Sequence, residues 1–253
     1  MPRLPLELAY LNLEVVRLVE KMSLEATAEY RCQADLDIYD SPTCTRLATQ
    51  AATGRHLWIK DLELEIASEV YLCEDEYSGW LAAQDLKRLK PSGTSYQSLV
   101  VSASEISNRL PAVIRFTQQA MQQPNYYLWG GTVGPNYDCS GLMQAAFAST
   151  GIWLPRDAYQ QEAFTQSIAI EELLPGDLVF FGPDRKATHV GLYLGGECYI
   201  HSSGQEMGRN GIGIDRLSLG GDRVSRSYYE QLRGAGRVVK SYEPKRQKRV
   251  DEE

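Results

Sequence analysis

The sequence predicts an α+β protein in which a small β-barrel domain precedes a domain of helices and an antiparallel sheet. Between Tyr30 and Lys90, short runs rich in β-branched and aromatic residues alternate with turn residues, which is typical of several short strands. Beyond Lys90, helical segments come first and strand segments divided by glycines follow. Helices and strands in separate stretches favour an α+β fold over alternating βαβ units.

The chain has 253 residues, enough for one large domain or two smaller ones. Near its start, apolar residues recur at helical spacing, at Leu8, Leu11, Val15, Leu18 and Met22. We therefore expect an N-terminal extension with a helix (1–25), a small β-barrel (26–90), a linker (91–105), a helix-and-sheet domain (106–240) and a charged tail (241–253).

Four segments supply the strands of the barrel: YRCQADLDIYD, HLWIKDLELEI, EVYLC and SGWLAAQDL. Turn dipeptides such as Ser41-Pro42 and Thr53-Gly54 punctuate this part of the chain. The next segment, LKPSGTSYQS (89–98), has Pro91 and Gly93 among polar residues and no hydrophobic period. That composition indicates a linker.

The second domain begins with two predicted helices. PAVIRFTQQAMQQP places Pro111 at a first helical position and ends at Pro124. The second helix starts at Cys139 and runs to Gly151, which has the position of a C-terminal cap. Three strands follow, in LVFFG, HVGLYLG and CYIHSSG.

Charge and hydropathy bound the partners of the protein. A formal net charge of −7 argues against a general affinity for nucleic acid. There is no apolar run of about 18 residues, as a membrane span requires, and the N-terminal segment lacks the apolar centre of a secretory signal. We expect a cytoplasmic protein without a membrane partner, unless a signal segment has been removed.

The five cysteines are scattered, at Cys32, Cys44, Cys73, Cys139 and Cys198. Their odd number and the absence of a CxxC pair indicate reduced thiols, not a disulfide framework. Histidines and carboxylates show no metal-ligand spacing, and no glycine-rich phosphate loop of a recognised type is present. We therefore expect neither a metal nor a cofactor.

Cys139 is the candidate nucleophile, because polar residues flank it at the start of a predicted helix. The thiolate is the reactive form of cysteine. A cysteine in the first position of a helix lies against unpaired backbone N–H groups and the positive end of the helix dipole, which favour the thiolate. A nearby imidazole would complete the activation.

The sequence has only three histidines, and two of them flank a predicted hairpin. His56 lies in the barrel domain and is interpreted as a structural strand residue. A three-residue loop, 194–196, would place His189 directly opposite His201 on one face, whereas a strict two-residue loop would place them on opposite faces. With the first geometry, Cys139 and the two histidines provide a nucleophile, a base and an orienting group.

Five motifs in the second domain occur in a familiar order: YLWGG (127–131), YDCSGL (137–142), LLPGDLVFF (173–181), THVGLYLG (188–195) and HSSG (201–204). Over roughly residues 111–238 they resemble the NlpC-type cell-wall cysteine peptidases, a papain-like family of bacteria. The segment 30–90 resembles a bacterial SH3-type domain, by texture and architecture. The resemblance thus implies a papain-like catalytic domain after a small SH3-like β-barrel.

The resemblance also implies roles for individual residues. Cys139 would attack the scissile carbonyl, His189 would transfer the proton, and His201 would orient His189. Tyr127 would polarise the carbonyl or stabilise its oxyanion; the alternative is a packing role. The candidate substrate-binding residues are Asp138, Ser140, Arg156, Asp157 and Tyr77. For Asp138, capping of the helix is an equal alternative, and an exposed ion pair explains Arg156 and Asp157 as well.

Members of this family cleave the bond between γ-linked D-glutamate and a diamino acid in peptidoglycan stem peptides. A cytoplasmic member would act on short free peptides with an N-terminal L-alanine, such as L-Ala-γ-D-Glu-meso-diaminopimelate, in murein recycling. Three alternatives remain open: an exported hydrolase of intact wall, a thiol-dependent acyltransferase and a non-catalytic binding module. The sequence does not determine the oligomeric state.

Overall fold

The computed structural model describes residues 29–61 and 66–245 of the chain. The chain divides into two compact units, Met1–Tyr96 and Gln97–Glu253. The helix expected within residues 1–25 lies outside the described residues, and so do residues 246–253 of the charged tail. Within the described ranges, no helix is long and apolar enough to cross a membrane.

Unit 1 is an SH3-like domain built on one seven-stranded antiparallel sheet with the order β3-β2-β6-β5-β4-β1-β7. Its elements are β1 (Glu29–Cys32), β2 (Leu36–Tyr39), β3 (Leu47–Ala51), β4 (His56–Asp61), β5 (Ala67–Leu72), β6 (Ser78–Ala82), the 3-10 helix η1 (Ala83–Arg88) and β7 (Leu89–Pro91). Alternate residues of the strands face the core, as in β2, where Leu36 and Ile38 are buried and Asp37 is exposed.

Unit 2 combines a six-stranded antiparallel sheet, ordered β10-β15-β11-β12-β13-β14, with helices. The sheet strands are β10 (Gln166–Ile168), β11 (Leu178–Phe181), β12 (His189–Gly195), β13 (Cys198–Ser203), β14 (Gly211–Arg216) and β15 (Leu232–Arg237). The remaining elements are α2 (Ala103–Gln122), β8 (Thr132–Val133), β9 (Asn136–Tyr137), α3 (Cys139–Ala148), α4 (Ala158–Phe164), η2 (Ile170–Glu172), η3 (Gln205–Met207) and α5 (Arg223–Tyr229). The predicted α+β class is confirmed.

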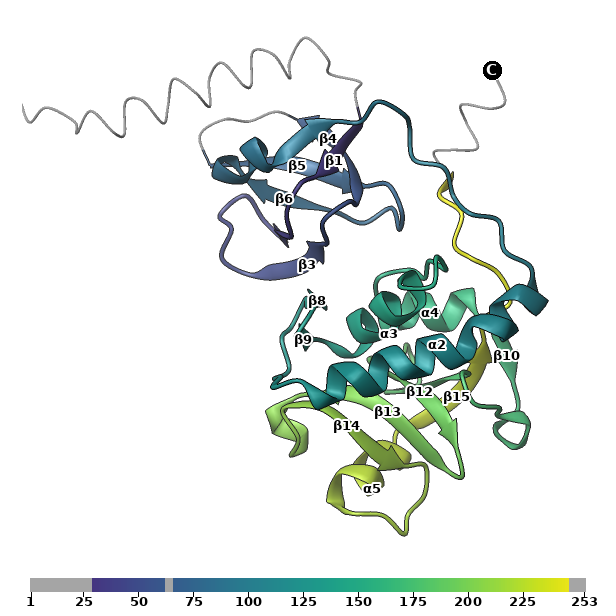
Figure 1. The fold of residues 1–253 in the computed structure, drawn as a ribbon. Coiled ribbons are helices and arrows are strands. Elements are labelled where there is room, and N and C mark those ends of the chain that lie inside the picture. Colours follow the sequence, from purple (N-terminus) through teal and green to yellow (C-terminus); the bar gives the residue numbers. More distant parts are fainter. Residues whose placement is uncertain (1–28, 62–65, 246–253) are drawn as a thin grey trace, which may run out of the picture. The chain divides into compact units, whose positions relative to one another are not determined.

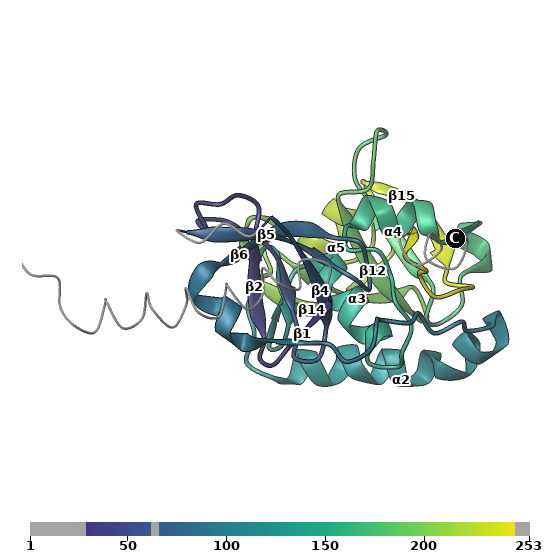
Figure 2. The ribbon, with the colours of Figure 1, turned by 90° about the horizontal axis from the view of Figure 1, so that it is seen from above.

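Two hydrophobic clusters lie on opposite faces of the sheet of unit 2. On one face, side chains of α2 and α3 pack against alternate strand residues that include Phe180 and Leu192. On the other face, α5 packs against the intervening residues, which include Phe181 and Tyr199. Figure 1 shows α3 and α5 on the two sides of the strands, and Figure 2 shows the long α2 extending along unit 2. The sheet is therefore the middle layer of unit 2.

The helix expected to start at Pro111 starts eight residues earlier, at Ala103. Ser102 and Glu105 form a capping box there, in which each side chain pairs with the backbone N–H of the other residue. Pro111 lies inside α2. The expected helix start at Pro111 was wrong because the Ser102–Glu105 capping box, and not the proline, marks the beginning of α2.

Helix α3 begins at Cys139, as the sequence predicted. The Asp138 carboxylate accepts a hydrogen bond from the Gly141 N–H at 2.7 Å and so caps the helix. The first turn lies very close to the preceding loop, because a Cβ atom at Gly141 would stand 2.0 Å from the Gly131 carbonyl oxygen. Only glycine fits there, and this contact fixes the start of α3 against the loop.

The hairpin between β12 and β13 differs from the expected one. Leu192 lies opposite Ile200 and Tyr193 opposite Tyr199, and an irregularity between Tyr193 and Gly195 then shifts the register. The two loop residues, Gly196 and Glu197, have positive φ angles of 58° and 62°, as a type I′ turn requires.

His189 and His201 are consequently not directly opposite each other but diagonal, two positions out of register. The extra residue of the bulge keeps both rings on the same face of the sheet, where a two-residue loop alone would have separated them. The structure thus follows neither of the two loops considered from the sequence: the loop has two residues, yet with the bulge the rings share a face.

Candidate active site

Cys139 is the first residue of α3, and its side chain is buried, with 6% of the residue exposed. The backbone N–H groups of Val190 and Ser140 form hydrogen bonds to the sulfur. Val190 directly follows His189, so the Cys139 sulfur lies next to the start of β12. Burial, followed by the nearby Asp138 carboxylate, raises the pKa of the Cys139 thiol to about 12. Burial thus opposes the thiolate that the helix start favours.

The two histidines form a hydrogen-bonded pair on the α5 face of the sheet. His189 Nε2 lies 2.6 Å from His201 Nδ1. Both rings contact Tyr228 of α5, and the Tyr228 ring stacks on His189 with 4.3 Å between centroids. Burial and the neighbouring His201 hold the pKa of His189 well below its usual value. His189 is therefore a neutral imidazole, and Nδ1 is the ring nitrogen that does not contact His201.

The second contact of His201 is a carboxylate that the sequence analysis missed. His201 Nε2 lies 2.6 Å from Asp215 Oδ2, and the Arg209 guanidinium pairs with both oxygens of Asp215. Asp215 lies on β14 opposite Tyr199, two residues before His201 on β13. The alternation in GIGIDR (211–216) placed Asp215 on one face of a strand, but nothing local indicated which face contains the histidines.

Tyr127 lies in the same site, since both Cys139 and Tyr228 affect the ionisation of its hydroxyl. Burial, followed by the Cys139 and Asp138 side chains, raises the pKa of Tyr127 above its usual value. The phenol is therefore a neutral hydrogen-bond donor at physiological pH, as a group that polarises a carbonyl should be. That role of Tyr127 stays a prediction.

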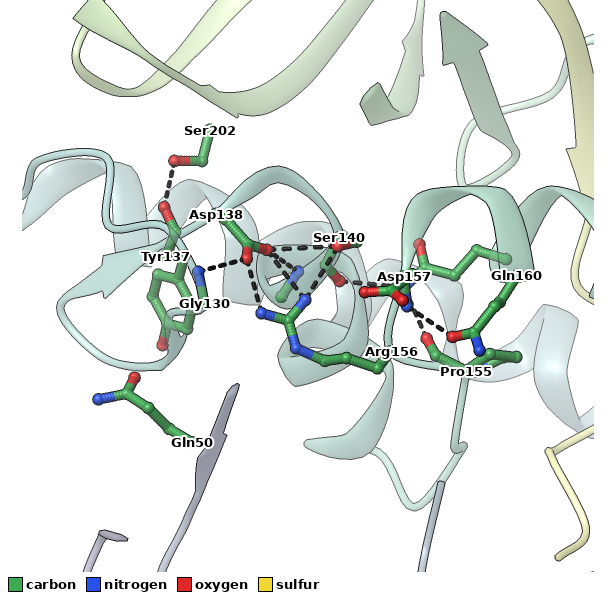
Figure 3. Close-up of polar contacts among 12 residues, drawn as sticks. Gln50, Gly130, Tyr137, Asp138, Ser140, Pro155, Arg156, Asp157, Gln160 and Ser202 are labelled. Carbon is green, nitrogen blue, oxygen red and sulfur yellow. Dashed lines mark hydrogen bonds and ion pairs between the residues drawn. The ribbon is translucent and has the colours of Figure 1, made fainter. Parts of the chain in front are cut away.

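Asp138, Ser140 and Arg156 form one buried cluster around the start of α3 (Figure 3). Arg156 donates from Nη1 to Asp138 Oδ1 at 3.1 Å and from Nη2 to Oδ2 at 2.6 Å. The carboxylate also accepts from the N–H of Gly130 at 2.9 Å. Arg156 is 1% exposed, so the suggested exposed ion pair with Asp157 is wrong: its partner is Asp138 within the core.

Two substrate-binding candidates remain, Asp157 in unit 2 and Tyr77 in unit 1. Asp157 precedes α4, and its backbone N–H donates to Gln160 Oε1 at 3.0 Å. Burial raises the pKa of its carboxyl. Tyr77 belongs to unit 1, in the turn before β6, where its carbonyl accepts from the Leu72 N–H. Substrate contacts for Asp138, Ser140, Arg156, Asp157 and Tyr77 stay predictions.

These groups can perform acyl transfer to a thiol. The thiol of Cys139 and the imidazole of His189 are both neutral at rest, so the proton would move from Sγ to Nδ1 as sulfur attacks a carbonyl carbon. Among the described residues no cluster of histidine, cysteine and carboxylate side chains could hold a metal ion. A cysteine at a helix start together with a histidine pair on neighbouring strands is the set of groups that a papain-like cysteine peptidase uses.

Two parts of the chain match known families. Residues 124–231 match the NlpC/P60 family, and residues 38–86 match the bacterial dipeptidyl-peptidase Sh3 domain. The chain thus carries an NlpC/P60 peptidase domain after a bacterial SH3 domain, and the resemblance found in the sequence is confirmed.

Two curated relatives come from Bacillus subtilis. A gamma-D-glutamyl-L-lysine dipeptidyl-peptidase is 40% identical over 96 residues, which cover 37% of this chain and 31% of that protein. The bifunctional muramidase/DL-endopeptidase CwlT is 48% identical over 73 residues, or 27% and 22% of the two chains. This chain therefore spans less than a third of either relative. A solved NlpC/P60 family protein from Bacillus cereus is 23% identical, with a TM-score of 0.46. The matched region covers 87% of this chain and 66% of that protein.

The ionisation of His189 predicts the acid side of the pH profile. Peptide cleavage requires neutral His189 as the base, so kcat/KM should rise as pH increases through the pKa of His189. Because that pKa lies well below 6.5, we expect full activity at pH 6.5 and an acid limb below it. The measurement is kcat/KM between pH 4 and 9. A limb centred at or above pH 6.5 would contradict this assignment.

Proposed function

We propose that this protein is a cysteine endopeptidase that hydrolyses the γ-D-glutamyl bond to the diamino acid of peptidoglycan stem peptides. The observation that carries the proposal is that the Cys139 sulfur, at the start of α3, accepts a hydrogen bond from the N–H of Val190, the residue after His189, which is itself paired with His201. In this mechanism the Cys139 sulfur attacks the γ-carbonyl carbon of D-glutamate while its proton passes to His189. Protonated His189 gives that proton to the amine of the diamino acid, which departs and leaves a thioester between Cys139 and the γ-carbonyl; water then hydrolyses the thioester and restores the thiol.

The substrate class rests on the relatives. The name of one Bacillus subtilis relative states a gamma-D-glutamyl-L-lysine dipeptidyl-peptidase, and the SH3 match of this chain is to the domain type of bacterial dipeptidyl-peptidases. An enzyme that releases dipeptides has to recognise the free N-terminus of its substrate. Both similarities therefore support short free peptides with an N-terminal L-alanine, as in murein recycling. A cytoplasmic location is part of the same proposal.

A second candidate is a hydrolase that remodels intact wall. It is favoured by the similarity to a protein named as a muramidase and DL-endopeptidase. The two candidates share the same chemistry and differ in whether the N-terminus of the stem peptide must be free. The name of one relative states L-lysine as the diamino acid, whereas the peptide proposed here contains meso-diaminopimelate, so both kinds of peptide are relevant substrates.

The experiment compares four substrates by mass spectrometry with the full-length protein. These are L-Ala-γ-D-Glu-meso-diaminopimelate, the L-lysine analogue, the first peptide acetylated at its N-terminus, and intact sacculi. We expect release of L-Ala-γ-D-Glu from a free peptide and, because acetylation removes the ammonium group, a strong loss of cleavage for the blocked one.

Each other outcome selects a different function. Cleavage of sacculi together with the acetylated peptide would make the protein a wall hydrolase. Thioester formation with lipid acyl donors, without peptide cleavage, would indicate an acyltransferase. No reaction with any of these substrates would overturn the proposal and favour a binding module.

A further inference from the structure

We propose that the ion pair of Asp215 and Arg209 is a positioning device that sets the tautomers of both histidines and thereby keeps Nδ1 of His189 free of a proton. The proposal deepens the proposed function, because it concerns how the base of that reaction is prepared. It rests on a continuous chain of contacts from Arg209 through Asp215 and His201 to His189.

The first step is the contact between Asp215 and His201. Asp215 is 3% exposed, and its Oδ2 lies 2.6 Å from His201 Nε2. Burial would raise the pKa of this carboxyl, but hydrogen bonds from His201 and Arg209 outweigh burial and lower it. Asp215 is therefore a carboxylate, which can only accept. His201 must carry a proton on Nε2, and when this ring is neutral its Nδ1 is an acceptor.

The second step transmits this choice to His189. His201 Nδ1 lies 2.6 Å from His189 Nε2, and one of the two nitrogens has to donate. Since His201 Nδ1 accepts, His189 Nε2 carries the proton and His189 Nδ1 carries the lone pair. This is the tautomer that can accept the proton of the Cys139 thiol. Once His189 becomes an imidazolium, a neutral acceptor at His201 still stabilises it.

The third step concerns charge, because a lone buried carboxylate would do more than orient His201. An unpaired anion in contact with an imidazole favours the imidazolium. His201 would then carry protons on both nitrogens, and its Nδ1–H would force His189 Nε2 to accept. That exchange would move the proton of His189 onto Nδ1 and remove the base.

Arg209 prevents this exchange by neutralising Asp215. The guanidinium donates to both carboxylate oxygens, from Nε to Oδ2 at 2.9 Å and from Nη2 to Oδ1. The hydroxyl of Ser225 donates to Oδ1 at 3.2 Å. With the carboxylate paired in this way, burial dominates and lowers the pKa of His201. His201 consequently stays neutral, which the second step requires.

The charged and titratable groups around His201 are consistent with this balance. They are His189 from β12, Asp215 from β14, Arg209 before β14, Asp222 and Tyr228 from the α5 region, and Tyr199 from its own strand. Asp222 is 3.7 Å from Arg209 at the closest, and its side chain is 61% exposed. Asp215 is therefore the carboxylate that acts directly on His201.

The test reads the ring protons directly, in long-range ¹H–¹⁵N spectra of the full chain labelled at its three histidines. At neutral pH we expect protons on Nε2 and not on Nδ1 of both His189 and His201. In Asp215→Asn the amide can either donate or accept, so both rings should populate mixed tautomers. We expect kcat to fall on the order of 10²-fold, the size of a general-base contribution, with KM nearly unchanged.

Arg209→Met makes a different and sharper prediction. His201 should become an imidazolium at neutral pH, with both nitrogens protonated in the spectrum. Activity should be low at pH 7 and recover as the pH rises and His201 loses its extra proton, whereas Asp215→Asn should not recover. Arg209→Lys keeps the charge and should restore most of the wild-type profile.

Asp222→Asn is the matched control, since it removes a carboxylate near the same arginine while asparagine still caps α5. We expect wild-type spectra and a wild-type pH profile for it. A proton on Nδ1 of His189 in the wild-type protein would overturn the proposal. So would unchanged histidine spectra in Asp215→Asn, or an Arg209→Met profile without recovery at high pH. If the wild-type tautomers are as expected but no peptide is cleaved, the proposed function fails and the tautomer assignment stands.

Discussion

Replacing Cys139 by alanine should abolish peptide cleavage, with a fall in kcat of about 10⁴-fold or more, as for nucleophiles of other hydrolases. The reason is that the sulfur at the start of α3 is the group that forms the covalent bond, and neither histidine can replace it. Substrate binding should persist, because binding groups around the site are unchanged. The measurement is cleavage of the free tripeptide together with its Kd.

Cys198→Ala provides the matched control for Cys139→Ala. Cys198 is a free cysteine on β13, three residues from His201, and alternation along the strand places its side chain on the other face. We expect wild-type activity for this variant. Loss of activity in Cys198→Ala, or residual cleavage in Cys139→Ala above a hundredth of the wild-type rate, would contradict the assignment of the nucleophile.

Arg156→Ala should destabilise unit 2 by about 3–5 kcal/mol, the usual cost of leaving a buried charge without its partner. Arg156 makes two hydrogen bonds to the Asp138 carboxylate, which caps α3 directly before Cys139. Without the guanidinium, the Asp138 carboxylate would remain in the core without a counter-charge. The measurement is the free energy of unfolding of unit 2 by denaturant titration.

Two further variants make the Arg156 prediction specific. Arg185→Ala removes an exposed arginine between β11 and β12 and should change the free energy of unfolding by less than about 0.5 kcal/mol. Adding Asp138→Asn to Arg156→Ala removes the unpaired charge while keeping a capping side chain, so it should recover part of the loss. A loss for Arg156→Ala as small as that for Arg185→Ala would contradict the role of the buried pair.

Local signals in the sequence located the start of one helix and not that of the other. The start of α3 was predicted to the residue, because an aspartate cap and a cysteine followed by an apolar helix are local signals. The start of α2 was missed although its capping box is equally local. The hairpin register was not found from the sequence. A two-residue turn combined with a bulge puts the two histidine rings on the same face of the sheet, as a three-residue loop would. Sequence parity cannot separate these two cases.

Two groups of contacts were not available from the sequence. The partner of Arg156 depends on a fold that brings the segment before α4 to the start of α3, 18 residues earlier. Asp215 reaches His201 only because β14 pairs with β13, and Arg209 reaches Asp215 from the preceding loop. None of these residues carries a local pattern that differs from an ordinary surface charge.

The sequence by itself determined the two domains' classes and the position of Cys139 at a helix start, and it predicted that His189 and His201 share a face, because motif order and local periodicity encode them. Only the tertiary structure decided the diagonal contact of His189 with His201, the buried pair of Arg156 with Asp138 and the support of His201 by Asp215 and Arg209. It also introduced the burial that opposes ionisation of the Cys139 thiol. The physical reason is that burial and strand pairing are properties of distant segments brought together, and they set both the pKa of a thiol and the tautomer of an imidazole.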